Sequence, residues 1–287
     1  MAAQELTSAS IDQAFEIAVK RLADDLRYGS DLSRYSGSGV DYLQSRPFVD
    51  GDSVKDIDWR VTARTQRYHV KENESLKTTP IYLVVDTSAS MAISSTHMSK
   101  HALAALVAGG LALAGLERLS PVGLVAAGER ELHFRPSLSR GPVFQWLHNL
   151  RYRKFDERTL LAERIDQIGA LLNSTSLVVV ISDLHDEEAV PAIKRLAQRH
   201  DCIVIQIEDP AERGCLRGGM FRGVEAETGR TFVAHGRTRW FVDPEQRPHH
   251  SLKSAAVDYL LLATDRPFVA PLRRFLQERG AVMRNTR

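Results

Sequence analysis

Three oxygen-bearing side chains stand at alternate positions at the end of a short apolar run. Residues 81–91 read "IYLVVDTSASM", in which Asp86 ends the apolar run and Ser88 and Ser90 follow it. Because residues two apart in an extended stretch point the same way, these side chains can present oxygens to one point. Mg²⁺ takes about six oxygen ligands and keeps several waters, so carboxylates and hydroxyls suit it, whereas Ca²⁺ prefers a larger cage. The pattern predicts a site for a hard divalent cation.

Two later stretches supply further oxygens. In "LVVVISDLHD" a second apolar run at residues 177–181 ends in Ser182 and Asp183, and in "FDERTLL" Thr159 stands just before an apolar-periodic helix. Parallel strands end at one edge of a sheet, where ligands of open α/β sheets bind. We therefore expect Asp183 close to Asp86, with Ser182 supporting the loop. Thr159 either caps the helix that follows or contributes to the same site.

The elements that must position these residues alternate along the chain from residue 80 onward. Apolar runs typical of buried strands alternate with segments of helical periodicity, which indicates a doubly wound, mostly parallel α/β sheet with helices on both faces. We also expect an antiparallel edge hairpin at 121–135 and a second hairpin that turns near Thr228. The expected strands are 81–86, 121–126, 131–135, 177–182 and 203–208, and the expected helices are 97–118, 141–150, 160–172, 188–199, 249–263 and 268–279.

The first part of the chain has a different pattern. Apolar residues recur at helical spacing over residues 10–27, which predicts an amphipathic helix. Residues 29–79 are rich in Gly, Ser and Asp with short apolar pieces, which indicates turns and short strands. We therefore expect residues 1–78 to form a small N-terminal module of a helix and short strands, and residues 79–287 to form the α/β domain.

Composition limits the classes of function. The chain has 287 residues, 43% of them hydrophobic, and a net charge of only +2, so nothing global favours nucleic acid. The start lacks a signal-peptide pattern and the two cysteines have no paired spacing, so a cytoplasmic location is expected. The apolar run 102–116 has 15 residues against about 20 needed to span a bilayer. We expect a buried helix there, with its glycines packed tightly against the sheet, and no membrane span.

Other polar clusters favour structural roles. In "HMSKH", His97 and His101 are four residues apart but lack the Glu of a zinc-binding HExxH motif. Ile57 and Trp59 are expected to pack in the N-terminal module. A structural salt-bridge network is expected there too, formed by Asp52, Asp58, Arg60 and Arg64.

Taken together, the motifs resemble a known family. The stretches "DTSASM" and "ISD" and the loop Thr159 resemble the metal-ion-dependent adhesion site of a von Willebrand factor A-like domain. The upstream "RPFVDGDSVKDIDWRVTAR" resembles the segment that precedes this domain in the bacterial domain-of-unknown-function family fifty-eight. The resemblance implies that Ser88, Ser90 and Thr159 coordinate Mg²⁺ through hydroxyls, with Asp86 and Asp183 acting directly or through water. Mn²⁺ and Ca²⁺ are alternative ions.

The resemblance also implies a function. Many members of that family accompany MoxR-type AAA+ ATPases, so the expected role is a non-enzymatic, Mg²⁺-dependent adaptor in remodelling or maturation of protein complexes. A client protein would supply a carboxylate to the metal. The chain has no G-x-x-x-x-G-K-[ST] loop, so ATP hydrolysis would belong to the partner.

Two alternatives remain open. In the first, the chain is a Mg²⁺-dependent phosphohydrolase with Asp86 as its nucleophile. The haloacid-dehalogenase-like pattern, however, has a second acidic residue two positions later, where this chain has Ser88. In the second, the chain is a passive scaffold whose metal site has decayed.

Overall fold

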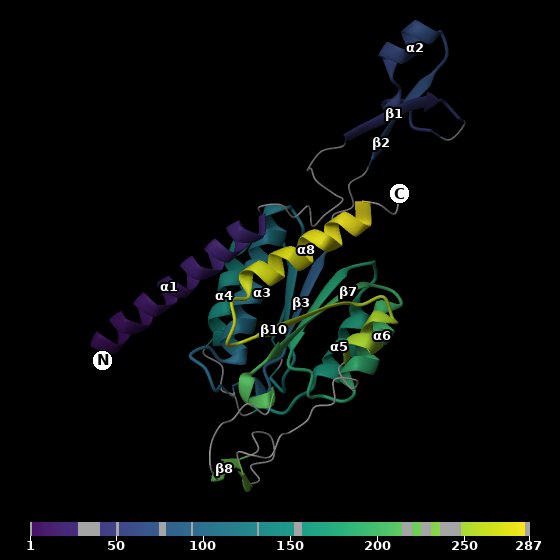
Figure 1. Ribbon diagram of the computed structural model, residues 1–287. Helices are drawn as coiled ribbons and strands as arrows, with labels where there is room; N and C mark the ends of the chain where they lie inside the picture. The colour runs from purple at the N-terminus through teal and green to yellow at the C-terminus, as the bar shows by residue number, and fades with distance from the viewer. Residues whose placement is uncertain are drawn as a thin grey trace. The chain divides into compact units, whose positions relative to one another are not determined.

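The chain forms two compact units, of which the larger combines Met1–Leu32 with Thr79–Arg287 and the smaller is Ser33–Thr78 (Figure 1). The computed structural model describes residues 2–27, 41–49, 52–74, 79–92, 94–130, 132–151, 157–213, 220–224, 231–235 and 248–284.

A six-stranded sheet forms the centre of the larger unit (Figure 1). Its strands are β3 (Ile81–Val85), β4 (Val122–Ala126), β5 (Leu132–Ser137), β6 (Leu177–Ser182), β7 (Asp201–Glu208) and β10 (Asp258–Ala263). They lie in the order β10-β7-β6-β3-β4-β5, and every neighbouring pair is parallel except β4 with β5. The prediction of a mostly parallel sheet with an antiparallel hairpin at its edge is confirmed.

The strand β10 occupies part of a predicted helix. The helix α7 (Pro248–Lys253) has only six residues, and Ala256 soon after it has a φ of 56°, which does not continue a helix. Residues 258–263 then pair in parallel with β7. The prediction of one helix over 249–263 was wrong because a short apolar run such as "YLLLA" suits either state. Pairing with β7 decides between them.

Helices cover both faces of the sheet (Figure 1). On one face lie α1 (Ala2–Arg27), α3 (Lys100–Glu117), α4 (Arg140–Arg151) and α8 (Val269–Arg284), and on the other lie α5 (Leu161–Leu171), α6 (Ala189–Ala197) and α7. Leu83 and Val85 of β3 belong to the first apolar cluster, whereas Val84 belongs to the second. Because both faces are buried, β3 is apolar without alternation.

The helix α3 runs through the first apolar cluster. It is long and apolar enough to cross a membrane by length and composition, but 83% of this 18-residue segment is buried inside the unit. A helix that packs on most of its sides needs an apolar surface all round. Its composition is therefore accounted for by burial, as predicted from the length of the apolar run.

Glycines in α3 allow a close approach of two neighbouring elements. A Cβ atom at Gly110 would lie 2.6 Å from Leu22 Cδ2, and one at Gly109 would lie 2.9 Å from Val19 Cγ1, so both glycines face α1. A Cβ atom at Gly115 would lie 2.8 Å from Ile81 Cδ1. Only Gly115 of these three therefore packs against the sheet as predicted, while the other two accommodate α1.

The helix α1 belongs to the larger unit. Val19, Leu22 and Leu26 are buried in the same cluster as α3. This helix packs on α3 in the same unit as the sheet, while Ser33–Thr78 forms a unit of its own. An amphipathic pattern predicts that a helix buries one face, but it does not say which partner covers that face.

The smaller unit contains short elements, as predicted. They are β1 (Asp41–Pro47), the 3₁₀ helix η1 (Val54–Asp56), α2 (Trp59–Thr65) and β2 (His69–Glu74), and β1 pairs with β2 antiparallel. Ile57 is buried, but the Trp59 side chain is 63% exposed. The predicted packing role holds for Ile57 and is wrong for Trp59.

A second hairpin is formed by β8 (Met220–Val224) and β9 (Thr231–His235), which pair antiparallel. The predicted turn at Thr228 lies outside the described residues.

Candidate metal centre

Two aspartates follow neighbouring strands at the carboxyl edge of the sheet. The strands β3 and β6 pair in parallel with Val85 opposite Ile181, and the Asp86 N–H donates to the Ile181 carbonyl at 2.9 Å. Asp86 and Asp183, which follow these strands, are both buried. The predicted adjacency of the two strands is confirmed. Burying a carboxylate is costly unless polar groups satisfy it, so this edge must supply them.

The turn after β3 brings two hydroxyls together. The Ser88 N–H donates to Asp86 Oδ1 at 2.9 Å, which is the side-chain-to-backbone bond of an Asx turn. The 3₁₀ helix η2 (Ala89–Ala92) follows, and Ser88 Oγ lies 3.0 Å from Ser90 Oγ. The backbone turns where an extended stretch was expected, yet the two hydroxyls lie side by side.

Serine hydroxyls connect the two aspartates across the strands. The Ser90 Oγ donates to Asp183 Oδ2 at 2.7 Å, and the Ser182 Oγ donates to Asp86 Oδ2 at 2.6 Å. The Ser182 Oγ also accepts the Leu184 N–H at 2.8 Å, which matches its predicted supporting role in the loop. Four of the five predicted metal ligands, Asp86, Ser88, Ser90 and Asp183, therefore form one buried hydrogen-bonded cluster.

Thr159 lies in a loop that is attached to this turn. The Ala89 N–H donates to the Glu157 carbonyl at 3.1 Å, two residues before Thr159. The N-cap residue of α5 is Leu160 and makes no side-chain cap, while Asp186 Oδ2 accepts the Ala162 N–H at 3.0 Å. Thr159 is thus not the N-cap residue of α5, and its loop lies against the Asp86 turn.

A buried lysine adjoins the cluster. Lys100 is the first residue of α3 and its side chain is 0% exposed. Its Nζ donates to Asp183 Oδ2 at 2.7 Å and also forms an ion pair with Glu212. The sequence does hold a signal for this lysine, because a charged residue at the start of a long apolar helix must either reach water or find a buried counter-charge.

Glu212 and His185 complete the group around Asp183. The His185 ring nitrogens lie 3.6 Å from Asp183 Oδ2 and 3.7 Å from Glu212 Oε1. One ligand atom each from Asp183, His185 and Glu212 falls within 4.8 Å of the others. The His185 side chain is half exposed. No motif marks Glu212, which reaches the group through the 3₁₀ helix η3 (Pro210–Arg213).

A third aspartate, after β7, holds this arrangement in place. Asp209 is fully buried and accepts the Ser95 N–H at 3.0 Å and the Ala211 N–H at 2.9 Å. Its own N–H donates to Glu212 Oε2 at 2.9 Å. The η3 turn and the segment before α3 are therefore tied to the same sheet edge, and Glu212 is held in position toward Lys100.

The pKa values of the two central carboxyl groups are shifted in opposite directions. Burial, with repulsion from Asp183, raises the pKa of Asp86 to about 6, although hydrogen bonds from Ser182 and Ser88 oppose the rise. Burial also acts to raise the pKa of Asp183, but the charges of Lys100 and His185 outweigh it, so that pKa is lowered. Burial acts to lower the pKa of Lys100, but Asp183 and Glu212 outweigh it and raise it. Asp183 and Lys100 thus stabilise each other in their charged forms.

The donor set fits a hard cation. Carboxylate and hydroxyl oxygens converge from two strand ends, and oxygen ligands are the ones that Mg²⁺, Mn²⁺ and Ca²⁺ select. The Lys100 ammonium group, which donates to Asp183 Oδ2 at 2.7 Å, shows that a positive charge is stabilised beside this carboxylate. Asp86, Ser88, Ser90 and Asp183 would hold the metal.

The histidine and cysteine residues that remain as candidates from the sequence have structural surroundings where the structure describes them. The His101 Nε2 lies 3.0 Å from the Leu150 carbonyl in the interior. Burial raises the pKa of the Cys202 thiol to about 12, which makes it unreactive. Cys215 lies outside the described residues.

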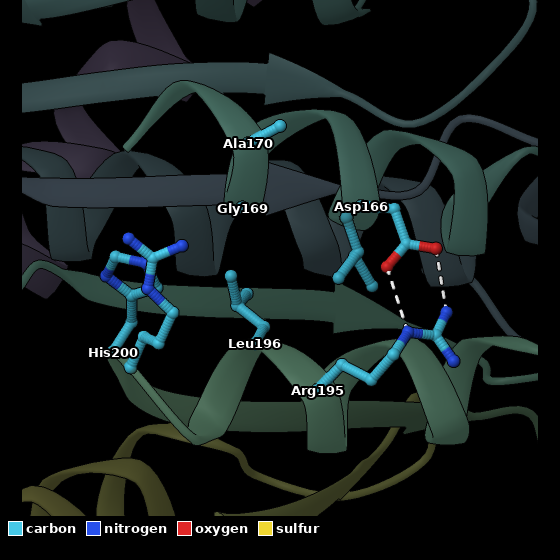
Figure 2. A pocket seen from close by; sticks show the side chains of 8 residues that line it. Asp166, Gly169, Ala170, Arg195, Leu196 and His200 are labelled. Carbon is cyan, nitrogen blue, oxygen red and sulfur yellow. Dashed lines mark hydrogen bonds and ion pairs between the residues drawn. The ribbon is translucent and has the colours of Figure 1, made fainter. Parts of the chain in front are cut away.

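A separate cavity of about 220 Å³ lies between α5 and α6 (Figure 2). Arg195 donates to both oxygens of Asp166 across it, at 3.3 and 2.7 Å. His200 is buried beside it, and burial together with the Arg199 charge lowers the pKa of His200. The carboxylate in this cavity is already paired with Arg195, so the cavity lacks the convergent acidic oxygens found at the sheet edge.

Solved structures offer only weak similarity. The conserved hypothetical protein BatB of Bacteroides thetaiotaomicron aligns with a TM-score of 0.48 and 15% identity, over 71% of this chain and 98% of BatB. The RO (RSR) protein of Deinococcus radiodurans aligns with a TM-score of 0.36 and 14% identity, over 70% of this chain and 34% of that protein. Neither value is high enough to assign a specific fold or a function.

Sequence relatives and a family model place the chain more firmly. Uncharacterized proteins of Mycobacterium tuberculosis and Mycobacterium bovis are each 25% identical to it over 290 residues, which cover 94% of this chain and 90% of each relative. The model of the family described as "Protein of unknown function DUF58" matches residues 44–241, which is more than half of the chain. The upstream segment and the two aspartate motifs all fall within that match, and this protein belongs to the DUF58 family.

Proposed function

We propose that this chain is a non-enzymatic adaptor that binds a partner protein through Mg²⁺ held at the carboxyl edge of its sheet. In this proposal the larger unit is a von Willebrand factor A-like domain and the polar cluster is its metal-ion-dependent adhesion site. The proposed ligands are Asp86, Ser88, Ser90, Thr159 and Asp183, with Mn²⁺ and Ca²⁺ as alternative ions.

The observation that carries the proposal is the convergence of four predicted ligands. Asp86 and Asp183 come from strands that are remote in sequence, and Ser90 joins them by donating to Asp183 at 2.7 Å. If these positions only served the core, apolar residues would suit them better, because a buried polar group destabilises a fold unless its hydrogen bonds are fully satisfied. A cation-binding role accounts for the choice of oxygen ligands at this edge.

The charges favour recognition of an acidic group. A divalent ion balanced by two carboxylates and neutral hydroxyls would keep an electrophilic position for one more oxygen ligand. A carboxylate of a client protein has the charge and the geometry to fill it. On this basis the client contributes an acidic side chain to the complex.

Local geometry favours binding over phosphoryl transfer. The Asp86 side chain is fully buried, and its two oxygens accept bonds from the Ser88 N–H and the Ser182 Oγ. A nucleophilic carboxylate must reach its substrate, whereas a carboxylate that binds metal can act from the interior through a bound water. Ser88 also stands where the phosphohydrolase pattern has its second acid.

The proposed partner is a MoxR-type AAA+ ATPase, and the proposed location is the cytoplasm. Both rest on the resemblance of the upstream segment and the Asp-x-Ser-x-Ser motif. The chain would present its client to the ATPase or regulate it, during remodelling or maturation of protein complexes.

A binding experiment tests this function. The purified chain is immobilised, and retention of client proteins and of a MoxR-type ATPase from a native lysate of the same organism is measured in Mg²⁺ and in EDTA. We expect retention by the wild type only in Mg²⁺ and none by Asp86→Ala, whose folding is checked by circular dichroism. The matched control is Asp166→Ala, an exposed carboxylate that should leave retention unchanged. Equal retention with and without Mg²⁺ contradicts the metal-dependent adaptor.

A further inference from the structure

The side chain of Lys100 is buried at a position where two effects oppose a positive charge. The side chain is 0% exposed, so its ammonium group has lost its water. Lys100 is also the first residue of α3, next to the N-cap Ser99, where the helix dipole disfavours a cation. Ordering a long side chain adds an entropic cost. Among the described residues, the carboxylates of Asp183 and Glu212 pair with the ammonium group and compensate for these effects.

The lysine occupies an oxygen that a metal ion at this site would need. Asp183 Oδ2 accepts the Ser90 Oγ and the Lys100 Nζ, each at 2.7 Å. The other oxygen, Oδ1, accepts the His185 N–H at 3.3 Å. A divalent ion that also binds the Ser90 hydroxyl would coordinate Oδ2, the oxygen that this hydroxyl contacts, and would there take the place of a hydrogen-bond donor. Repulsion between the ion and the ammonium group makes Lys100 the donor that leaves, since a serine hydroxyl can bind the ion itself.

Glu212 is the second carboxylate that pairs with the lysine. Its side chain is 20% exposed, and its Oε2 accepts the Asp209 N–H at 2.9 Å while Oε1 contacts Lys100. The charged groups that face the ammonium group from the neighbouring elements are therefore Asp183, Glu212 and the ring of His185. Glu212 stands at the boundary between this buried group and solvent, where an acidic side chain from another protein would arrive.

We infer that the metal-free site is occupied by the chain's own charges, with Lys100 in the place of the divalent cation and Glu212 in the place of the partner's carboxylate. This inference rests on the proposed function and assigns a regulation to the same site. Metal binding displaces Lys100 from Asp183 and breaks the contact between Lys100 and Glu212. A partner's acidic side chain and the metal ion then replace the internal pair together.

A consequence is that Lys100 lowers the affinity of the site for metal. The ion must compete with a positive charge that is already in place, and it gains less from Asp183 than from a free carboxylate. Lys100→Met keeps the length and the apolar stem of the side chain and removes only the charge. We expect this variant to bind Mn²⁺ at least about tenfold more tightly than the wild type.

The first measurement is a titration of each full-length variant with Mn²⁺ alone, followed by the decrease in the EPR signal of the free ion. The matched control is Lys253→Met, which removes an exposed lysine of α7 and should leave the dissociation constant unchanged. Because Lys100→Met leaves Asp183 without its counter-charge, its thermal unfolding is measured in EDTA and in Mn²⁺. We expect a lower melting temperature in EDTA, and a larger gain on adding Mn²⁺ than the wild type shows.

A second variant tests the role of Glu212 separately. Glu212→Gln removes one of the two carboxylates that hold Lys100, so we expect Mn²⁺ to bind about two- to threefold more tightly than to the wild type. Weaker binding would show instead that Glu212 ligates the metal, and would overturn its role as a placeholder.

The outcomes separate this inference from the proposed function. If wild type and Lys100→Met bind Mn²⁺ equally, and Asp86→Asn abolishes binding in both, Lys100 does not compete with the metal ion and this inference is wrong. The same result would still support the proposed metal site. If none of the variants binds Mn²⁺, both the inference and the metal-dependent adaptor fail.

Discussion

The aspartates of the smaller unit and those of the sheet edge are satisfied in opposite ways. Asp52 accepts two bonds of 2.7 Å from Arg46 and the Val49 N–H at 2.9 Å, and these contacts hold its pKa at about 2. At the sheet edge, burial and the neighbouring Asp183 raise the pKa of Asp86 to about 6. One carboxylate has a complete set of nearby partners, and the other is stabilised poorly as an anion.

The separation of partners along the chain accounts for the difference. Asp52 is six residues from Arg46, and Asp58 Oδ1 caps α2 by accepting the N–H groups of Arg60 and Val61. Both aspartates have structural partners, but Asp52 pairs with Arg46, which the predicted salt-bridge network did not include. Asp183, by contrast, is 83 residues from Lys100. The partners of Asp52 are thus local in sequence, whereas those of Asp183 come together only in the folded chain.

Among the substitutions that test this comparison, removal of the Asp183 carboxylate should change the free energy of unfolding most. Asp183→Asn leaves the buried Lys100 with Glu212 alone, so we expect the free energy of unfolding to fall by about 3–5 kcal/mol. Urea denaturation at pH 7 in EDTA measures this change. The matched control, Asp166→Asn, breaks an exposed pair with Arg195 and should be indistinguishable from the wild type. A similar loss in both variants would mean that burial does not distinguish the two pairs.

The next largest effect is the change with pH in the contribution of Asp86 to stability. Because its folded-state pKa is raised to about 6 from 3.8, its contribution to stability is full below about pH 4 and is lost as the pH rises through 6. In EDTA, the stability of the wild type relative to Asp86→Asn should therefore fall between pH 4 and 6, by an amount on the order of 2 kcal/mol. Urea denaturation series at several pH values measure the difference. A pH-independent difference would show that burial does not destabilise the Asp86 anion.

The smallest effect is expected in the smaller unit. Asp58→Ala removes the cap of α2 and the bond of 2.7 Å from the Ser45 Oγ. We expect a local loss of about 1 kcal/mol. Hydrogen exchange of the Arg60 and Val61 amides measures it, and Ser53→Ala, which removes a cap bond of 3.4 Å, serves as the control. Unchanged protection after Asp58→Ala would show that the cap contributes nothing.

Much of the sheet could be predicted from local pattern. Apolar runs without alternation marked β3 and β6, and their carboxyl ends carry Asp86 and Asp183 as expected. The strand β10 could not be predicted in the same way, because its apolar run suits a helix equally well and its pairing with β7 is remote in sequence. The partner of α1 was missed for a similar reason, since the glycines of α3 that receive it gave no sign of which element they face.

The sequence alone identified the oxygen-bearing residues of the proposed cation site. Residue types and alternate spacing identified Asp86, Ser88 and Ser90, and the pattern of the second strand identified Asp183, because these signals are local. Only the tertiary structure brought Lys100 and Glu212 to Asp183, from segments with no shared motif. Electrostatic partners are chosen by distance in space, and the folding of α3 and η3 onto one sheet edge sets that distance.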